Sequence, residues 1–197
     1  MGRIFLLMGK SSSGKDTIYR ELIKTKALGL KKIVSYTTRP MREGENDGVQ
    51  YLFKNEEEYK LLRADNKIIE ERAYDTKCGI WRYFTADDGQ IDLNDGNYLI
   101  IGTLESYCYI RDYFGKDNVV PIYIDTDSGN RLKRAMHREE KQENPRYDEM
   151  CRRFLADEED FSDAKLSEAQ IDKRFENNAE IEDCIKEITE YIAQKIR

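Results

Sequence analysis

Residues 9–17 read Gly9-Lys10-Ser11-Ser12-Ser13-Gly14-Lys15-Asp16-Thr17, and this stretch decides which fold the chain can adopt. It follows a short apolar, β-prone run at residues 4–8 and precedes residues 17–24, where apolar side chains recur at helical spacing. Strand, glycine-bearing loop and helix in this order are the context in which Gly-x-x-x-x-Gly-Lys predicts a phosphate-binding loop. We expect Gly9 and Gly14 to permit backbone angles that a side chain would block.

The predicted loop binds phosphate mainly through its backbone. Several N–H groups point into one concavity, and the following helix adds its positive end. Lys15 is expected to reach the β- and γ-phosphates of a nucleotide. A tight strand-to-helix turn that binds nothing is the alternative, which the apolar strand in front and the Gly14-Lys15 pair disfavour.

The residue after the lysine departs from the usual pattern, which has Ser or Thr there to hold Mg²⁺. This chain has Asp16 instead, and the hydroxyl follows one residue later at Thr17. Two roles stay open for Asp16, which are contact with a metal through water and capping of the helix. Thr17 and Asp16 are therefore the predicted Mg²⁺ residues, with the nucleotide and water supplying most of the ligands.

The composition of the chain limits its partners and its location. The 197 residues predict one domain, or one core with inserted lobes. The net charge of −6 provides no bulk basic field for DNA, RNA or an acidic membrane. Four widely separated cysteines and one histidine argue against a protein-built zinc site and favour free thiols in the cytoplasm. The apolar start is too short to span a membrane, so we interpret it as a core strand and not as a signal peptide.

A second group of motifs lies in residues 35–53. It reads Ser35-Tyr36-Thr37-Thr38-Arg39-Pro40-Met41-Arg42-Glu43-Gly44-Glu45, followed by Gly48 and by Tyr51-Leu52-Phe53. Arg39 and Arg42 lie three residues apart on a glycine-flanked loop, where two guanidinium groups can hold a phosphate from two sides. Tyr51 adds a hydroxyl donor. Two solvated surface arginines are the alternative interpretation.

The rest of the chain alternates strands with helices. Alternating hydrophobicity predicts a strand at 49–53, and a cap-like Asn55 before three glutamates predicts a helix over 55–64. With the phosphate loop after the first strand, this order predicts an α/β fold with a parallel, doubly wound core and helices on both faces. Further strands are expected at 67–74, 98–101 and 119–124, and a packing helix at 181–196.

The phosphate loop and the motif of residues 35–53, at this spacing, resemble those of guanylate kinases. The resemblance covers nearly the whole chain and is strongest from Gly9 to Phe53. It implies a reaction in which the γ-phosphate of ATP passes to GMP, giving GDP and ADP. It also implies a three-layer P-loop kinase core at 1–34, 94–130 and 156–197, an inserted acceptor-binding lobe at 35–93, and a mobile helical lid at 131–155.

The resemblance implies a set of site residues. ATP would be bound by Gly9, Ser11, Ser12, Ser13, Gly14, Lys15, Asp16 and Thr17, with Asn177 as the candidate contact with adenine. GMP would be bound by Ser35, Arg39, Arg42, Tyr51, Glu70, Tyr83 and Thr85, with the two tyrosines at its phosphate. The implied catalytic residues are Lys15, Arg39, Arg134, Arg138 and Arg153. Converging arginines would stabilise the charge of the transferring phosphoryl group, whereas ordinary helix ion pairs are the alternative.

Base choice would rest on one carboxylate. Guanine presents N1–H and N2–H₂ as adjacent donors, which a carboxylate can accept together, whereas adenine presents no such pair. Glu70 and Glu71 face opposite sides of a strand, so only one can point at the base, and the resemblance selects Glu70. Ser35 and Thr85 would donate to guanine O6, with Thr85 in a tyrosine-rich turn at residues 79–85.

The chain departs from the resemblance after the strand at 98–101. Guanylate kinases carry two aspartates there, one of which helps to bind guanine, whereas this chain has Gly102 and Leu104, with Glu105 as a candidate substitute. An altered acceptor would fit these changes, because the Gly-Lys-Asp loop also resembles that of ribose 1,5-bisphosphate phosphokinases. A third hypothesis is a non-catalytic module that binds a ligand or a phosphopeptide, although such scaffold relatives typically lose the phosphate loop that this chain keeps.

The expected partners are small-molecule nucleotides, with Mg²⁺ accompanying ATP as phosphoryl donor. We expect no nucleic-acid polymer and no membrane as a partner. Either a monomer or a homodimer is expected, with a role in purine metabolism.

Overall fold

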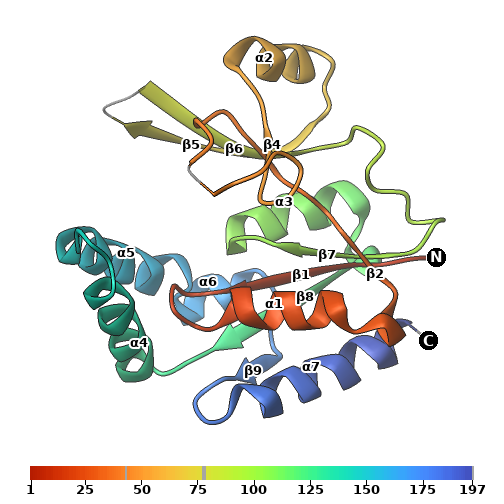
Figure 1. Cartoon of the computed structure of the whole chain (residues 1–197). Helices are drawn as coiled ribbons and strands as arrows, with labels where there is room; N and C mark the ends of the chain where they lie inside the picture. The colour runs from red at the N-terminus through yellow and green to blue at the C-terminus, as the bar shows by residue number, and fades with distance from the viewer. Residues whose placement is uncertain (43, 77–78, 197) are drawn as a thin grey trace.

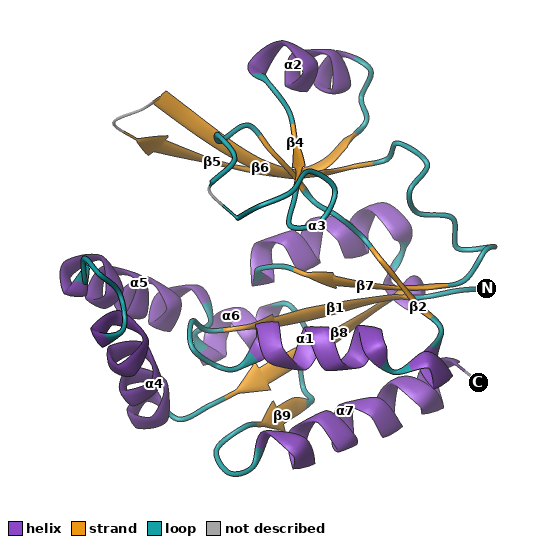
Figure 2. Ribbon diagram, in the orientation of Figure 1, coloured by secondary structure: helices purple, strands orange, loops and turns teal. Residues whose placement is uncertain are grey.

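The computed structural model describes residues 1–42, 44–76 and 79–196, and it contains two sheets (Figure 1). The larger sheet forms the core, and the smaller sheet belongs to a lobe formed by residues 36–86. Two helices stand apart from both sheets, beyond the carboxyl ends of the core strands (Figure 2). The fold is α/β with a mostly parallel central sheet, which confirms the predicted fold class.

The core sheet has the strand order β2-β7-β1-β8-β9, and every pairing in it is parallel. β1 occupies the centre and is buried along its whole length, as expected of an apolar run in a parallel sheet that is covered on both faces. The strands are β1 (Ile4–Gly9), β2 (Leu30–Lys32), β7 (Asn97–Ile101), β8 (Val119–Asp125) and β9 (Arg174–Glu176). Short 3₁₀ turns, η1 (Lys26–Leu28) and η2 (Lys116–Asn118), precede β2 and β8.

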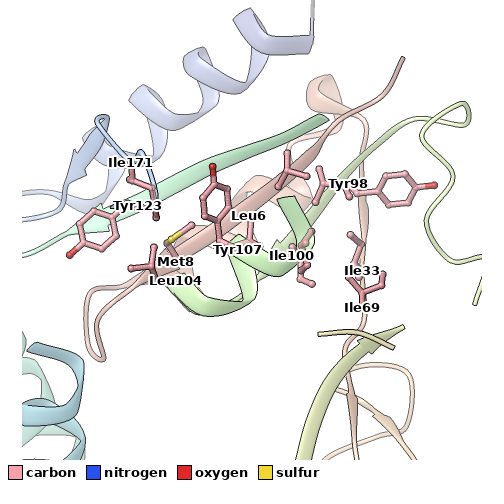
Figure 3. Close-up of a cluster of buried hydrophobic side chains, with 14 of the residues drawn as sticks. Leu6, Met8, Ile33, Ile69, Tyr98, Ile100, Leu104, Tyr107, Tyr123 and Ile171 are labelled. Atoms are coloured by element: carbon pink, nitrogen blue, oxygen red, sulfur yellow. The ribbon is translucent and has the colours of Figure 1, made fainter. Parts of the chain in front are cut away.

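Alternate side chains of β1 face two separate hydrophobic clusters, one on each face of the sheet. Phe5 and Leu7 pack against α1 and α7 on one face. Leu6 and Met8 pack against α3 and α6 on the other face, and Figure 3 shows this second cluster. The core therefore has the three layers predicted for it. Its helices are α1 (Lys15–Lys24), α3 (Leu104–Phe114), α6 (Asp163–Glu168) and α7 (Ile181–Ile196).

The lobe carries the second sheet, in the order β4-β3-β6-β5, with one helix packed on it. Tyr36, Tyr59 and Phe84 form its small core, in which the rings of Tyr36 and Phe84 stack with centroids 5.1 Å apart. Asn55 caps the helix as the sequence predicts, and the structure adds that Glu58 completes a capping box with it. The elements are β3 (Tyr36–Thr37), β4 (Leu52–Phe53), α2 (Glu56–Ala64), β5 (Ile68–Thr76) and β6 (Gly79–Ala86).

Three local predictions differ from the structure. The strand predicted at 49–53 forms only at Leu52–Phe53, because the residues before it make a turn in which the Gly48 N–H bonds to the Tyr51 carbonyl at 2.8 Å. Residues 79–85, expected as a turn, lie in β6, which pairs with β5 in antiparallel register. Residues 174–176, where the sequence predicts no strand, form β9, which pairs with β8. In the last two cases a distant strand completes the pairing, which a local pattern does not reveal.

The predicted lid consists of α4 (Ser128–Glu140) and α5 (Tyr147–Asp160), and both helices extend beyond the predicted range 131–155. They lie on the side of the core where β1 leads into the phosphate loop (Figure 1). α5 ends at Asp160, so its last turn lies outside the predicted lid range. Asp157 in this last part of α5 contacts Ser11 of the loop.

Two expectations from composition can be compared with the described residues. None of the helices in the described ranges is long and apolar enough to cross a membrane. Cys108, Cys151 and Cys184 are free thiols, as predicted, whereas Cys78 lies outside the described residues.

Candidate active site

The phosphate-loop motif turns between β1 and α1 through two residues in the left-handed region. Ser12 has φ 63° and Gly14 has φ 93°, so the backbone curls sharply ahead of Lys15, the first residue of α1. Gly14 thus uses the conformational freedom expected of it. Gly9 has a different role, because its φ is not positive and a Cβ there would lie 2.8 Å from the Ile124 carbonyl oxygen. The structure corrects the prediction at this position: Gly9 allows close packing against β8.

Asn177 supports the loop from inside the protein. The residue is 1% exposed, and its side-chain amide donates to the Ser13 carbonyl at 2.7 Å. A Cβ at Gly14 would lie 2.5 Å from the same amide nitrogen. The prediction that Asn177 contacts adenine is therefore wrong for this conformation, because its burial under the loop makes it a residue that holds the loop in shape.

The first turn of α1 carries three of the predicted residues. Lys15 is half-buried, and its ammonium forms no ion pair with the residues that the structure describes. Asp16 is exposed, and α1 begins without a side-chain cap, so capping does not explain Asp16. The Thr17 hydroxyl accepts a hydrogen bond from the Arg20 guanidinium at 3.3 Å. Asp16 and Thr17 offer oxygen atoms, the ligand type that Mg²⁺ prefers, so they fit the predicted metal.

Arg39 lies at the centre of a cluster on the lobe and is largely engaged by an internal partner. Its guanidinium donates to both carboxylate oxygens of Glu45, at 2.8 and 2.5 Å, and its side chain is only 3% exposed. The rings of Tyr51 and Phe53 flank it, each with its centroid 5.4 Å from the guanidinium carbon. The ring of Tyr83 lies 5.5 Å from that of Tyr51. The structure therefore brings together Arg39, Tyr51 and Tyr83, three of the residues assigned to the acceptor phosphate.

Arg42 joins this cluster through its backbone. Its side chain is exposed, and its N–H donates to the Glu45 carboxylate at 2.8 Å. Glu45 thus accepts hydrogen bonds from both residues that were expected to hold a phosphate, a role that the sequence-based prediction does not include. Carboxylates and phosphates accept from arginine in the same forked geometry, so an acceptor phosphate has to share these donors with Glu45.

The Arg39–Glu45 pair makes stability depend on pH at the acid end. Hydrogen bonds from the Arg39 guanidinium and from the Arg42 N–H lower the pKa of Glu45 from 4.5 to about 2. Because the folded-state pKa is depressed, the stabilisation is complete above about pH 4.5 and disappears as the pH falls towards 2. We expect the free energies of unfolding of the wild type and of Glu45→Gln to differ near neutral pH and to converge over this window. Urea unfolding across the window measures the difference, and a gap that stays constant with pH contradicts the prediction.

Glu70, and not Glu71, faces the interior between the lobe and the core. Its carboxylate oxygens accept hydrogen bonds from the Thr85 hydroxyl at 2.8 Å and from the Ser106 hydroxyl at 3.1 Å. Glu71 points to α2, where it accepts a hydrogen bond from Tyr59. The strand geometry thus agrees with the choice of Glu70. Thr85, however, directs its hydroxyl proton to Glu70, whereas the resemblance implied donation to guanine O6.

Two residues beside Glu70 are absent from the sequence-based prediction. Arg72 lies two residues further along β5 on the same face, and its Nε is 3.5 Å from a Glu70 carboxylate oxygen. This Nε is buried and makes no hydrogen bond within the described residues. Ser106 comes from the first turn of α3. The period of two along a strand could have indicated Arg72, but Ser106 lies 36 positions from Glu70, so no local pattern indicates it.

The other residues assigned to guanine are spread over neighbouring regions. Ser35 lines a further cleft of about 360 Å³ beside α1, to which Asp16 and Tyr51 also contribute. Leu104, at one of the positions where the resembled family has aspartate, is buried in the core. Glu105, the candidate substitute, is exposed in the first turn of α3 and lines a cleft of about 740 Å³ together with Arg72.

A cleft of about 460 Å³ joins the three parts of the site. Ser11 of the phosphate loop, Tyr51 and Tyr83 of the lobe, and Arg152 and Arg153 of the lid all line it. A group held by the loop and a group held by the lobe can therefore meet in one space. The α5 side of this space presents Arg152 and Arg153 together with the acidic side chains of Glu149, Asp157 and Asp160.

The predicted lid arginines divide between this cleft and α4. Arg153 lines the cleft and pairs with Glu149, with its Nε 3.3 Å from a carboxylate oxygen. Arg134 donates to the Asn177 carbonyl at 3.0 Å, close to the residue that holds the loop. Arg138 is exposed one turn further along α4. In this conformation Arg153 reaches the space between loop and lobe, and Arg134 contacts the segment under the loop.

The lid also contacts the phosphate loop through residues that the sequence-based prediction omits. The Asp157 carboxylate accepts the Ser11 N–H at 2.6 Å, and Lys10 donates to Glu158 at 2.7 Å. Arg131 is fully buried and binds Glu158. The contact of Asp157 with Ser11 joins residues 146 positions apart, so local spacing leaves no trace of it.

Together the fold and the site place the chain among α/β proteins with a parallel central sheet and a glycine-bearing loop after the first strand. The family model described as guanylate kinase matches residues 1–78. The crystal structure of guanylate kinase from Anaplasma phagocytophilum is similar to the chain, with a TM-score of 0.66 and 20% sequence identity over 99% of this chain and 86% of that chain. The chain thus matches guanylate kinase in sequence over residues 1–78 and has the guanylate kinase fold, which confirms the resemblance carried by the motifs.

Proposed function

We propose that this protein is a guanylate kinase-like phosphotransferase that transfers the γ-phosphate of ATP to GMP, giving ADP and GDP. The cleft that joins the phosphate loop, the lobe and the lid carries the proposal, because Ser11, Tyr83 and Arg153 all line it. Phosphoryl transfer needs two anionic groups held in line and kept from water, which is what two facing anion-binding sites under a lid provide. Such a reaction would take place in the cytoplasm, where both nucleotides are available.

The chain would act by positioning and by charge, without a covalent enzyme intermediate. The loop backbone and Lys15 would hold the phosphates of ATP, and Arg153 would stabilise the charge that spreads over the transferring oxygens. Arg39 has N–H donors beyond its three hydrogen bonds to Glu45 and Pro40, and these would bind the phosphate of GMP. Closure of α4 and α5 would exclude water.

Mg²⁺ would enter with ATP and be held mainly by its phosphates. Asp16 and Thr17 supply a carboxylate and a hydroxyl at neighbouring positions of α1, and they would contact the ion or its waters. When bound, the ion supplies positive charge that neutralises the phosphates.

A second candidate acceptor is favoured by Arg72. Its buried Nε, 3.5 Å from a Glu70 carboxylate oxygen, adds positive charge at the place where a carboxylate would recognise guanine. The Glu70 oxygens also accept hydrogen bonds from Thr85 and Ser106. An acceptor with a further anionic group, such as ribose 1,5-bisphosphate, would use Arg72, whereas guanine would use Glu70.

Production of ADP from ATP and Mg²⁺ across a panel of acceptors tests the proposal. The panel contains GMP, dGMP, AMP, CMP, UMP and ribose 1,5-bisphosphate. We expect turnover with GMP and dGMP and little with the other nucleotides, because only guanine offers two adjacent donors to Glu70. Turnover with ribose 1,5-bisphosphate alone would show that this compound, and not GMP, is the acceptor. ATP binding without turnover on any acceptor favours a non-catalytic module and overturns the enzyme proposal.

A further inference from the structure

We propose that Asp157 sets the affinity of the phosphate loop, because its carboxylate competes with nucleotide phosphate for the Ser11 N–H. The inference rests on the proposed function, in which this loop binds the phosphates of a nucleotide. It adds a determinant of nucleotide affinity that belongs to the lid helix α5 and not to the loop itself.

The position of the carboxylate is specific. Its Oδ2 accepts the Ser11 N–H at 2.6 Å, a short charge-assisted hydrogen bond. Ser11 is the third residue of the loop motif, whose backbone N–H groups are the atoms expected to bind phosphate. A carboxylate oxygen and a phosphate oxygen accept from the same donor in the same way, so only one of them can bind this N–H at a time.

The surrounding charges hold Asp157 in place. Arg131 is fully buried, and its Nη1 lies 3.8 Å from Asp157 Oδ2 and donates to the Ser11 carbonyl at 3.3 Å. Its guanidinium carbon also lies 4.5 Å from the centroid of the Phe154 ring, a cation–π contact with α5. A buried arginine between the two helices of the lid therefore aims the carboxylate at the loop.

A second acidic residue of α5, Glu158, forms an ion pair with Lys10, the second residue of the loop motif. Glu158 accepts from Lys10 at 2.7 Å and from Arg131. Lys10 is thus paired with α5. Lys15 is then the lysine of the motif that forms no ion pair with the described residues. Both contacts tie α5 to the loop, so a phosphate that displaces Asp157 has to act against this attachment.

The same face of α5 also carries an arginine that can attract a phosphate after the phosphate has displaced Asp157 from the Ser11 N–H. Arg153 lies four residues earlier, one helical turn away, and both residues line the cleft of about 460 Å³. A phosphate that takes the Ser11 N–H from Asp157 meets repulsion from this carboxylate and attraction from Arg153. Binding of nucleotide is thereby coupled to a shift of α5 relative to the loop.

Titration of ADP and of inorganic pyrophosphate without metal into the full chain tests the inference. Asp157→Ala is expected to bind both probes at least about fivefold more tightly than the wild type, because a charged competitor for the N–H is removed. Asp157→Asn keeps the shape of the side chain and removes its charge, so its affinity for both probes is expected to lie between those of the wild type and Asp157→Ala. Glu159→Gln removes one negative charge from an exposed position of the same helix and should change affinity less than about twofold.

The outcomes separate this inference from the proposed function. If the wild type binds ADP and neither Asp157 variant binds more tightly than Glu159→Gln, the competition does not exist. If neither the wild type nor the variants bind ADP or pyrophosphate, the loop is not a nucleotide site and both proposals fall. A merely structural role of Asp157 would weaken binding on substitution, whereas a gain in affinity supports competition. Thermal unfolding shows whether Asp157→Ala folds, and Asp157→Asn decides the question if it does not.

Discussion

Replacement of Lys15 by methionine is expected to lower ADP production about 10³-fold or more, with the fold intact. Lys15 is the first residue of α1, and its ammonium forms no ion pair within the described residues, so its charge is available to phosphate. Methionine keeps an unbranched apolar stem of similar length and removes the charge. The loss should therefore appear in turnover and in ATP affinity, which steady-state kinetics and titration calorimetry measure separately.

Lys24→Met is the matched control for this variant. Lys24 lies in the last turn of the same helix and pairs with Glu21 at 2.8 Å on the surface. An exposed pair of this kind contributes little, so turnover is expected to stay within about twofold of the wild type. Circular dichroism and thermal unfolding should be alike for both variants. Wild-type turnover in Lys15→Met would show that phosphoryl transfer does not take place at this loop.

Replacement of Glu70 by glutamine is expected to lower kcat/KM for GMP about 10²-fold, with ATP affinity unchanged. The glutamine amide keeps the size of the side chain but places an NH₂ group where a carboxylate oxygen would accept from guanine. The hydroxyls of Thr85 and Ser106 each lose part of a charged acceptor, which should lower stability slightly. Kinetics with GMP and AMP, together with ATP titration, measure the change in selectivity.

Glu71→Gln is the control, because it makes the same chemical change at the neighbouring position. Glu71 faces α2 and binds Tyr59, away from Glu70 and Arg72. We expect its kcat/KM for GMP to remain near that of the wild type. Equal effects of the two variants would mean that neither carboxylate recognises the base. An unchanged kcat/KM in Glu70→Gln would instead favour Arg72 as the residue that binds the acceptor, and an acceptor with a second anionic group.

The part of the fold that follows from the sequence is the part built from neighbours along the chain. The apolar run of β1, the loop and α1 are contiguous, and the same is true of the capping box at Asn55 and Glu58. Alternating strands and helices then imply a parallel core, because parallel strands need helical crossovers. Errors occur where pairing is distant, as in β6 and β9, whose partners are set by the sheet and not by local composition.

The residues of the candidate site likewise fall into those that local motifs predict and those that only the fold brings together. Motif spacing identifies Lys15, Arg39 and Glu70, whose side chains are placed by the local turn or strand that contains them. The same spacing misassigns Asn177, since burial under the loop depends on how β9 ends beside it. It also leaves out Glu45, the partner of Arg39, because a motif names the residue types but not which of them pair with each other.

By itself, the sequence determined that this protein has an α/β core with a glycine-bearing loop between its first strand and first helix, and an inserted lobe, because backbone geometry and hydrophobic period act over a few residues. Only the tertiary structure decided what faces that loop and that lobe. Ser106 reaches Glu70 across 36 positions, and Asp157 reaches Ser11 across 146. Such contacts depend on how helices pack on the sheet, and packing is set by the shape and burial of the whole core, which no local pattern encodes.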